Sequence, residues 1–171
     1  MKKLVLIVVY SVIFLIGCKM NYSFTGASIA PGTETISIID FPNMAPLVNP
    51  MLTNTFTEAL RDRFMAQTSL QIVKYNGDLN IEGTITGYST RPINIQAGTA
   101  NGDQAAQNRL TIKVKVKFVN TKDPDANFDS SFSRYSDYSS DRNLQDVEDF
   151  LVDEIVTQLV DDIFNKSVVN W

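Results

Sequence analysis

Three lysines at alternate positions give the sequence its clearest candidate for a binding chemistry. Lys113, Lys115 and Lys117 alternate with apolar residues, and in a β-strand they would share one face at a spacing of about 7 Å. Such a row of ammonium groups could bind the phosphate or carboxylate groups of an anionic ligand. The row has a second interpretation, because lysines also face solvent and protect sheet edges against aggregation. Arg91 and Arg109 bracket a polar segment and could extend the same patch.

The residue types that most catalytic sites need are missing. The chain has no histidine and a single cysteine. This excludes the commonest general base and the Ser-His-Asp arrangement, the usual zinc sites and an internal disulfide. Carboxylates remain, but their spacing indicates no acid–base pair, so an enzyme based on them is the least favoured alternative. We therefore interpret the chain as a non-enzyme that needs no cofactor and no metal.

The first residues have the layout of a secretory signal. Two lysines precede an apolar run from Leu4 to Ile16, which ends just before Gly17 and Cys18. The run is shorter than the ~20 residues that a membrane-spanning helix needs. The segment Leu-Ile-Gly-Cys resembles the lipobox of bacterial lipoproteins, in which the cysteine sulfur receives a diacylglycerol and the chain is cut before it. We therefore expect Cys18 to be lipidated; the alternative is a plain secretion signal with a chance cysteine.

Size and charge set the domain organisation. We expect residues 1–17 to be a signal peptide, residues 18–33 a lipid-anchored tether and entry segment, and residues 34–171 a single domain of ordinary size. An apolar content of 44% is sufficient for a packed core. The net charge of −4 argues against a general nucleic-acid binder, because such proteins need a basic surface.

Hydrophobic periodicity predicts an α+β domain. The predicted fold is a mostly antiparallel sheet of four to five strands with two helices packed on one face. The strands are expected over residues 35–41, 70–75, 79–91, 110–119 and 128–138, and the helices over residues 51–66 and 144–164. Asn49 is the expected N-cap of the first helix, with Pro50 at its first position. Residues 94–108 are polar and predict a long loop.

Two further expectations concern the third strand. The segment Asn76-Gly77-Asp78 before it predicts a hairpin with the preceding strand, because asparagine and glycine accept the positive φ of tight turns. Strict alternation along residues 79–91 places Tyr88 on the polar face. The glycines at positions 83 and 87 indicate a bend or a close backbone contact.

A more specific resemblance is carried by residues 22–64, which read YSFTGASIAPGTETISIIDFPNMAPLVNPMLTNTFTEALRDRF. This segment, about a quarter of the chain, resembles the start of the LptE family as found in Bacteroidetes-type bacteria. LptE is the lipopolysaccharide-assembly lipoprotein of the outer membrane. The resemblance implies a plug inside the large β-barrel LptD, a fold of two helices on a four-stranded sheet, and no catalysed reaction.

The resemblance also gives the candidate residues a ligand and a place. It implies lipopolysaccharide as the anionic ligand of Lys113, Lys115, Lys117, Arg91 and Arg109. Lys19, which follows the cysteine, is compatible with an outer-membrane lipoprotein that faces the periplasm and the barrel lumen. The expected partners are therefore an LptD-like barrel, lipopolysaccharide and the membrane, with no nucleic acid. The alternative is a free-standing periplasmic lipoprotein that binds a lipidic or small ligand by itself.

Overall fold

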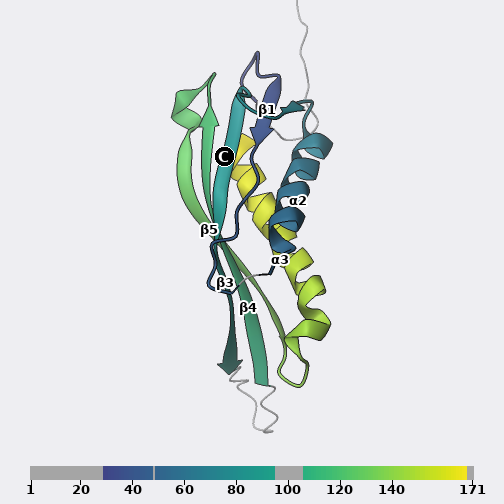
Figure 1. Ribbon diagram of the computed structural model, residues 1–171. Helices are drawn as coiled ribbons and strands as arrows, with labels where there is room; N and C mark the ends of the chain where they lie inside the picture. Colours follow the sequence, from purple (N-terminus) through teal and green to yellow (C-terminus); the bar gives the residue numbers. More distant parts are fainter. Residues whose placement is uncertain (1–28, 48, 95–105, 169–171) are drawn as a thin grey trace, which may run out of the picture.

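One mixed sheet carries two helices on one of its faces (Figure 1). The computed structural model describes residues 29–47, 49–94 and 106–168. Within them the strands are β1 (Thr35–Ile38), β2 (Gln71–Val73), β3 (Leu79–Asn94), β4 (Ala106–Asn120) and β5 (Phe128–Ser139), and the helices are α2 (Leu52–Gln67), the 3-10 turn η2 (Pro124–Ala126) and α3 (Leu144–Val168). The strand order is β2-β1-β3-β4-β5. The predicted α+β class is confirmed, but β1 runs parallel to both of its neighbours, so the sheet is mixed.

Alternating side chains build the core between sheet and helices. The even-numbered residues of β4 from Leu110 to Phe118 are all buried, as their alternation predicts. The helices add apolar stripes at helical spacing, and the buried set of α3 includes Val147, Leu151, Ile155, Leu159 and Ile163. The rings of Phe64 in α2 and Phe164 in α3 meet edge-on at 5.0 Å between centroids. The opposite face of the sheet carries neither helix, and we call it the open face.

The predicted hairpin between residues 70–75 and 79–91 is wrong. β2 and β3 do not pair with each other, because β1 lies between them and is parallel to both. The five residues from Lys74 to Asp78 instead cross over β1, and Asn76 takes the positive φ of 55° that the tight path needs. Gly77 is buried against the backbone of β1, where a Cβ atom would lie 2.6 Å from the nitrogen of Ser37.

The predicted position of Tyr88 on the polar face is also wrong. The pairing of β3 with β4 shifts between Ile85 and Gly87. This β-bulge adds one residue to β3, so every side chain after it changes face. Tyr88 is consequently buried and lies opposite Ile112. Its hydroxyl donates a 2.5 Å hydrogen bond to Glu148 of α3.

The segment between β1 and α2 packs beside β3. Phe41 is fully buried, and its ring occupies the space above Gly83, where a Cβ atom would lie 2.5 Å from that ring. The close contact expected from this glycine is therefore present. Asn43 forms an isolated bridge with Ile85, which holds the segment at the edge of β3.

The element boundaries differ slightly from those predicted. The loop expected over residues 94–108 is shorter, because Asn94 ends β3 and β4 already begins at Ala106; residues 95–105 lie outside the described part. Helix α2 begins at Leu52, and Met51 rather than Asn49 is its N-cap. Asn49 still contributes, since its Oδ1 accepts a hydrogen bond from the Met51 N–H at 2.9 Å. Neither α2 nor α3 has both the length and the apolarity needed to cross a bilayer.

Candidate binding surface on the open face of the sheet

The strand register brings all five predicted basic residues to the open face of the sheet. In the central strand β4, Arg109, Lys113, Lys115 and Lys117 alternate with the buried residues and point away from the helices. Arg91 of β3 lies directly opposite Arg109, so it shares that face. The row spans most of β4, and Arg109 and Arg91 lie nearest the end of β3 and the start of β4, which project together at the bottom of Figure 1.

Two lysines of the row are paired with carboxylates. Lys117 lies between Glu82 and Asp129 in the register, and its Nζ is 2.8 Å from Glu82 Oε1. That hydrogen bond and charge raise the pKa of Lys117. Lys115 reaches Asp129 at 3.2 Å. All four side chains are about half exposed, so these pairs stabilise the fold little. They do offset the positive charge at this end of the row.

Lys113 differs from its two neighbours in the row. Its cross-strand neighbours are Gly87 and Ser133, neither of which carries a charge. The stem of Lys113 passes over Gly87, where a Cβ atom would lie 3.3 Å from the Lys113 Cβ. Among the described residues, no carboxylate lies within ion-pair distance of its ammonium group. Lys113 is therefore the lysine of the row best able to meet an incoming anion.

Arg109 is held in place by two neighbours on β5. Its Nε and Nη2 atoms donate to the two carboxylate oxygens of Asp137 at 2.7 and 2.8 Å, and this bidentate contact raises the pKa of Arg109. The guanidinium carbon also lies 3.6 Å from the centre of the Tyr135 ring. Arg91 stands opposite with an exposed side chain. The sequence indicated the two arginines but not the acid and the aromatic ring that orient Arg109.

A groove of about 470 Å³ lies beside the lysine row. Its basic wall is formed by Lys115 and Lys117, and its apolar wall by Ile39 and Pro42 from the segment that follows β1. Glu82, Asp129 and Asp40 contribute carboxylates at the rim. The groove thus combines apolar surface with charges of both signs, which suits an amphiphilic ligand better than a simple anion.

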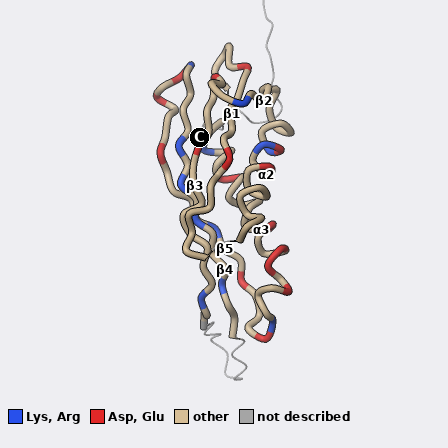
Figure 2. The backbone as a smooth tube through the Cα atoms, viewed as in Figure 1, with Lys and Arg blue, Asp and Glu red and all other residues tan. Residues whose placement is uncertain are grey.

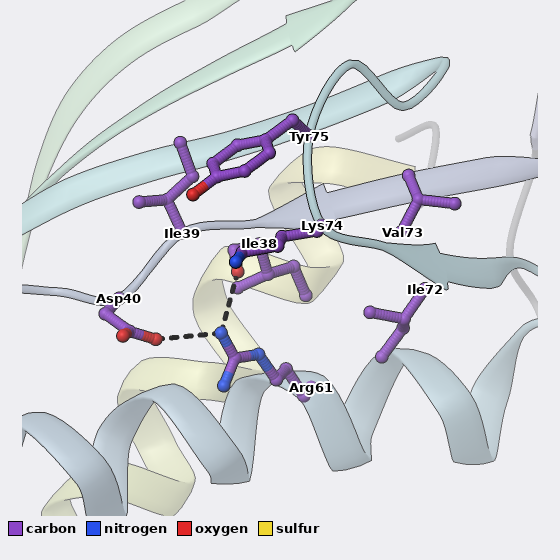
Figure 3. A pocket seen from close by; sticks show the side chains of 8 residues that line it. All are labelled: Ile38, Ile39, Asp40, Arg61, Ile72, Val73, Lys74 and Tyr75. Atoms are coloured by element: carbon purple, nitrogen blue, oxygen red, sulfur yellow. Dashed lines mark hydrogen bonds and ion pairs between the residues drawn. The ribbon is translucent and has the colours of Figure 1, made fainter.

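A second pocket of about 330 Å³ lies where β1 and β2 end (Figure 3). Arg61 of α2 forms its floor and donates to the carbonyl of Ile38 at 3.0 Å and to Asp40 at 2.8 Å. Ile39 and Tyr75 stand above, 42% and 62% exposed. Sequence reasoning missed this pocket, because its walls come from segments that only the crossover over β1 brings together.

The remaining predicted site residue is Cys18. Cys18 lies outside the described residues. In the part of the chain that the structure describes, no three histidine, cysteine, aspartate or glutamate side chains are grouped as metal ligands would be. The basic and apolar side chains of the open face together form a surface suited to binding an amphiphilic ligand.

Comparison with known proteins identifies the family. Residues 33–167 match the family described as LptE, lipopolysaccharide-assembly. The chain belongs to the LptE family. The match continues far past residue 64, where the resemblance in the sequence ends, and includes the whole sheet, α2 and all of α3 except its last residue. LptE is a family of non-enzymatic lipoproteins of lipopolysaccharide assembly. No curated protein matches the chain in sequence.

Solved structures of low sequence identity are also similar. The hypothetical protein CT253 from Chlamydia trachomatis is 8% identical with a TM-score of 0.52, over 81% of this chain and 99% of that one. The minor lipoprotein from Acinetobacter baumannii is 11% identical with a TM-score of 0.49, over 78% and 91%. Rare lipoprotein B from Shewanella oneidensis is 16% identical with a TM-score of 0.47, over 77% and 92%. At such identity, the likeness to the Chlamydia protein concerns the fold alone.

Proposed function

We propose that this LptE-family chain is the plug and assembly partner of an LptD-like β-barrel that delivers lipopolysaccharide to the outer leaflet of the outer membrane. The observation that carries the proposal is the family match over residues 33–167. The open sheet face supports it, since a cationic row beside an apolar groove suits a ligand with phosphates and acyl chains. The chain acts by binding, without catalysis.

The proposed position in the cell follows from the N-terminal segment. Residues 1–17 act as the signal peptide, Cys18 carries the lipid, and residues 18–33 connect the anchor to the domain of residues 34–171. Several acyl chains give stable attachment, because each buried methylene contributes about 0.8 kcal/mol. The domain then faces the periplasm and the barrel lumen.

The proposed contacts with lipopolysaccharide centre on Lys113 and Arg91. Lys115, Lys117 and Arg109 lie on the same face, but each already pairs with a carboxylate. A ligand phosphate must compete with those carboxylates for the paired side chains. We therefore assign first contact to Lys113 and Arg91, and a supporting role to the other three.

A pull-down tests the proposed function. The full chain with a C-terminal tag is extracted from its own membranes in mild detergent, and the proteins recovered with it are identified by mass spectrometry. The expected result is a near-stoichiometric outer-membrane β-barrel of the LptD type. Recovery of the chain alone, from membranes in which the barrels are intact, would contradict the plug and favour a free-standing binding module.

A further inference from the structure

The loop between β1 and α2 exposes three large apolar side chains. This proline loop comprises residues 41–47 and 49–51 and is the dark blue segment that leaves β1 and turns into α2 in Figure 1. Met44, Leu47 and Met51 are 71%, 58% and 65% exposed. Single exposed apolar residues are ordinary, but three in eight positions of one loop are a concentration that needs an explanation.

The loop is held in place by contacts beneath it. Its amide at Met44 donates to the carbonyl of Ile85 in β3 at 2.9 Å. Within the loop, the Asn43 side chain accepts from the Ala45 amide at 3.0 Å and donates to the Asn49 carbonyl at 3.3 Å. Three prolines, at positions 42, 46 and 50, restrict the backbone further. These contacts restrain the backbone on both sides of Met44, so binding through its side chain requires little ordering.

A contact to α3 fixes the second half of the loop. The Asn49 side chain donates to Glu148 Oε1 at 2.8 Å, and the same oxygen accepts the hydroxyl of Tyr88. Loop, sheet and helix therefore meet at one carboxylate. Two residues of the loop itself, Phe41 and Ala45, are buried. The inner side of the loop therefore belongs to the core, and its outer side is exposed.

Charge and area select the kind of partner. Residues 41–57 contain no charged side chain. The ionisable group that the loop contacts is the carboxylate of Glu148, which accepts a hydrogen bond from Asn49. An anionic lipid surface would find no basic residue here to bind. Three side chains also cover much less than the ~800 Å² that each partner buries in a stable dimer. The loop fits one contact within a larger, enclosing protein interface, and methionines adapt well to such a wall.

We propose that Met44, Leu47 and Met51 dock the chain onto an uncharged apolar patch on the inner wall of its β-barrel partner. This inference rests on the proposed function, from which it takes the identity of the partner. It places the wall contact at the edge of β3 and leaves the open face of the sheet, with Lys113 and Arg91, free for a ligand.

Charged substitutions in the loop test the inference. The double variant Met44→Glu, Leu47→Glu is compared with Met65→Glu, a matched control on α2 whose side chain is 54% exposed. The double variant should recover at least tenfold less barrel than the wild type, and the control should stay within twofold. Wild-type recovery of barrel by a double variant with an unchanged melting temperature would overturn the loop contact alone. Failure of the wild type to recover any barrel would overturn the proposed function as well.

Photo-crosslinking gives a readout that needs no destabilising charge. A photoreactive residue at position 47 of the otherwise native chain, irradiated in intact cells, should form an adduct with the same barrel, identified by mass spectrometry. The same residue at position 65 should not. Adducts of position 47 with lipid, or with a second copy of the chain, would overturn the inference.

Discussion

Asp78 joins separate segments of the chain through one side chain. Its Oδ2 accepts hydrogen bonds from the amides of Glu34 and Thr35 at 3.0 and 3.1 Å and from the Thr35 hydroxyl at 3.0 Å. Lys122 pairs with Oδ1 at 3.1 Å. The N–H of Glu34, the Lys122 ammonium and the Thr35 hydroxyl together hold the pKa of Asp78 well below its usual value. The ionised form of Asp78 thus fixes the point where the chain enters β1.

The variant Asp78→Asn should lower stability in a pH-dependent way. Because the pKa of Asp78 is depressed in the folded state, its contribution is fully present above the unfolded-state pKa of about 3.9 and is lost as pH falls toward the folded-state value. The difference in urea midpoint between wild type and variant should therefore be constant near neutral pH and shrink below about pH 4. Asp125→Asn is the control, because the Asp125 side chain is exposed and the substitution removes the same charge. A difference that widens with acidity would contradict this role.

At the scale of single residues, the sequence predicts which face of a strand a side chain occupies better than which side chains it contacts. Alternation alone placed Lys113, Lys115 and Lys117 on one exposed face, because a strand has a period of two. It could not predict that Glu82 and Asp129 neutralise two of them. Those contacts depend on the register between strands, which is set by residues distant in the chain.

Among the elements, the crossover over β1 depends on one glycine. The Gly77 φ is not positive, so the requirement is for space rather than for a special backbone conformation. In Gly77→Ala the new Cβ would lie 2.6 Å from the Ser37 nitrogen and 2.7 Å from the Leu79 carbonyl oxygen. We expect this overpacking to lower the free energy of unfolding by about 1–3 kcal/mol, measured by urea denaturation.

The neighbouring Asn76 supplies the matched control. Asn76 has a φ of 55°, which glycine adopts without strain. Asn76→Gly should therefore leave the unfolding free energy nearly unchanged. If both variants unfold like the wild type, the turn is not packed on β1 as the structure has it.

The sequence predicted all five strands and both helices, but not how the first three strands are arranged. Local pattern identifies elements through their hydrophobic period, and the periods of 110–119 and 144–164 are unambiguous. The insertion of β1 between β2 and β3 leaves no local trace, because Asn76-Gly77 is equally suitable for a hairpin and for a crossover. The bulge at Ile85 and Gly87 is similar, since one extra residue changes the face of Tyr88 without changing the composition.

Across the whole molecule, the balance of charge differs between the two sides of the sheet. Five basic side chains and the three carboxylates that pair with them lie on the open face of the sheet. Helix α3 instead carries most of its charge as carboxylates, whose positions along the backbone are red in Figure 2. Its acidic residues are Asp146, Glu148, Asp149, Asp153, Glu154, Asp161 and Asp162. An anionic ligand is repelled from the helix side and attracted to the sheet side. This difference in charge balance favours approach of such a ligand to the sheet side even though the net charge is negative.

Charge reversal at one lysine on each side of the molecule tests whether an anionic ligand binds to the open face of the sheet. Lys113→Glu changes the open face, and Lys166→Glu makes the same change in net charge on the helix side, where Lys166 contacts Ser130 and lies over the Phe128 ring. We expect Lys113→Glu to weaken binding of purified lipopolysaccharide by about threefold to tenfold at low salt, and Lys117→Ala to have a smaller effect, because Glu82 already offsets that lysine. Lys166→Glu should bind lipopolysaccharide like the wild type, in a comparison made at a temperature where both proteins are fully folded. If Lys113→Glu and Lys166→Glu lose the same affinity for lipopolysaccharide, net charge alone governs binding. The open face would then not be the binding site.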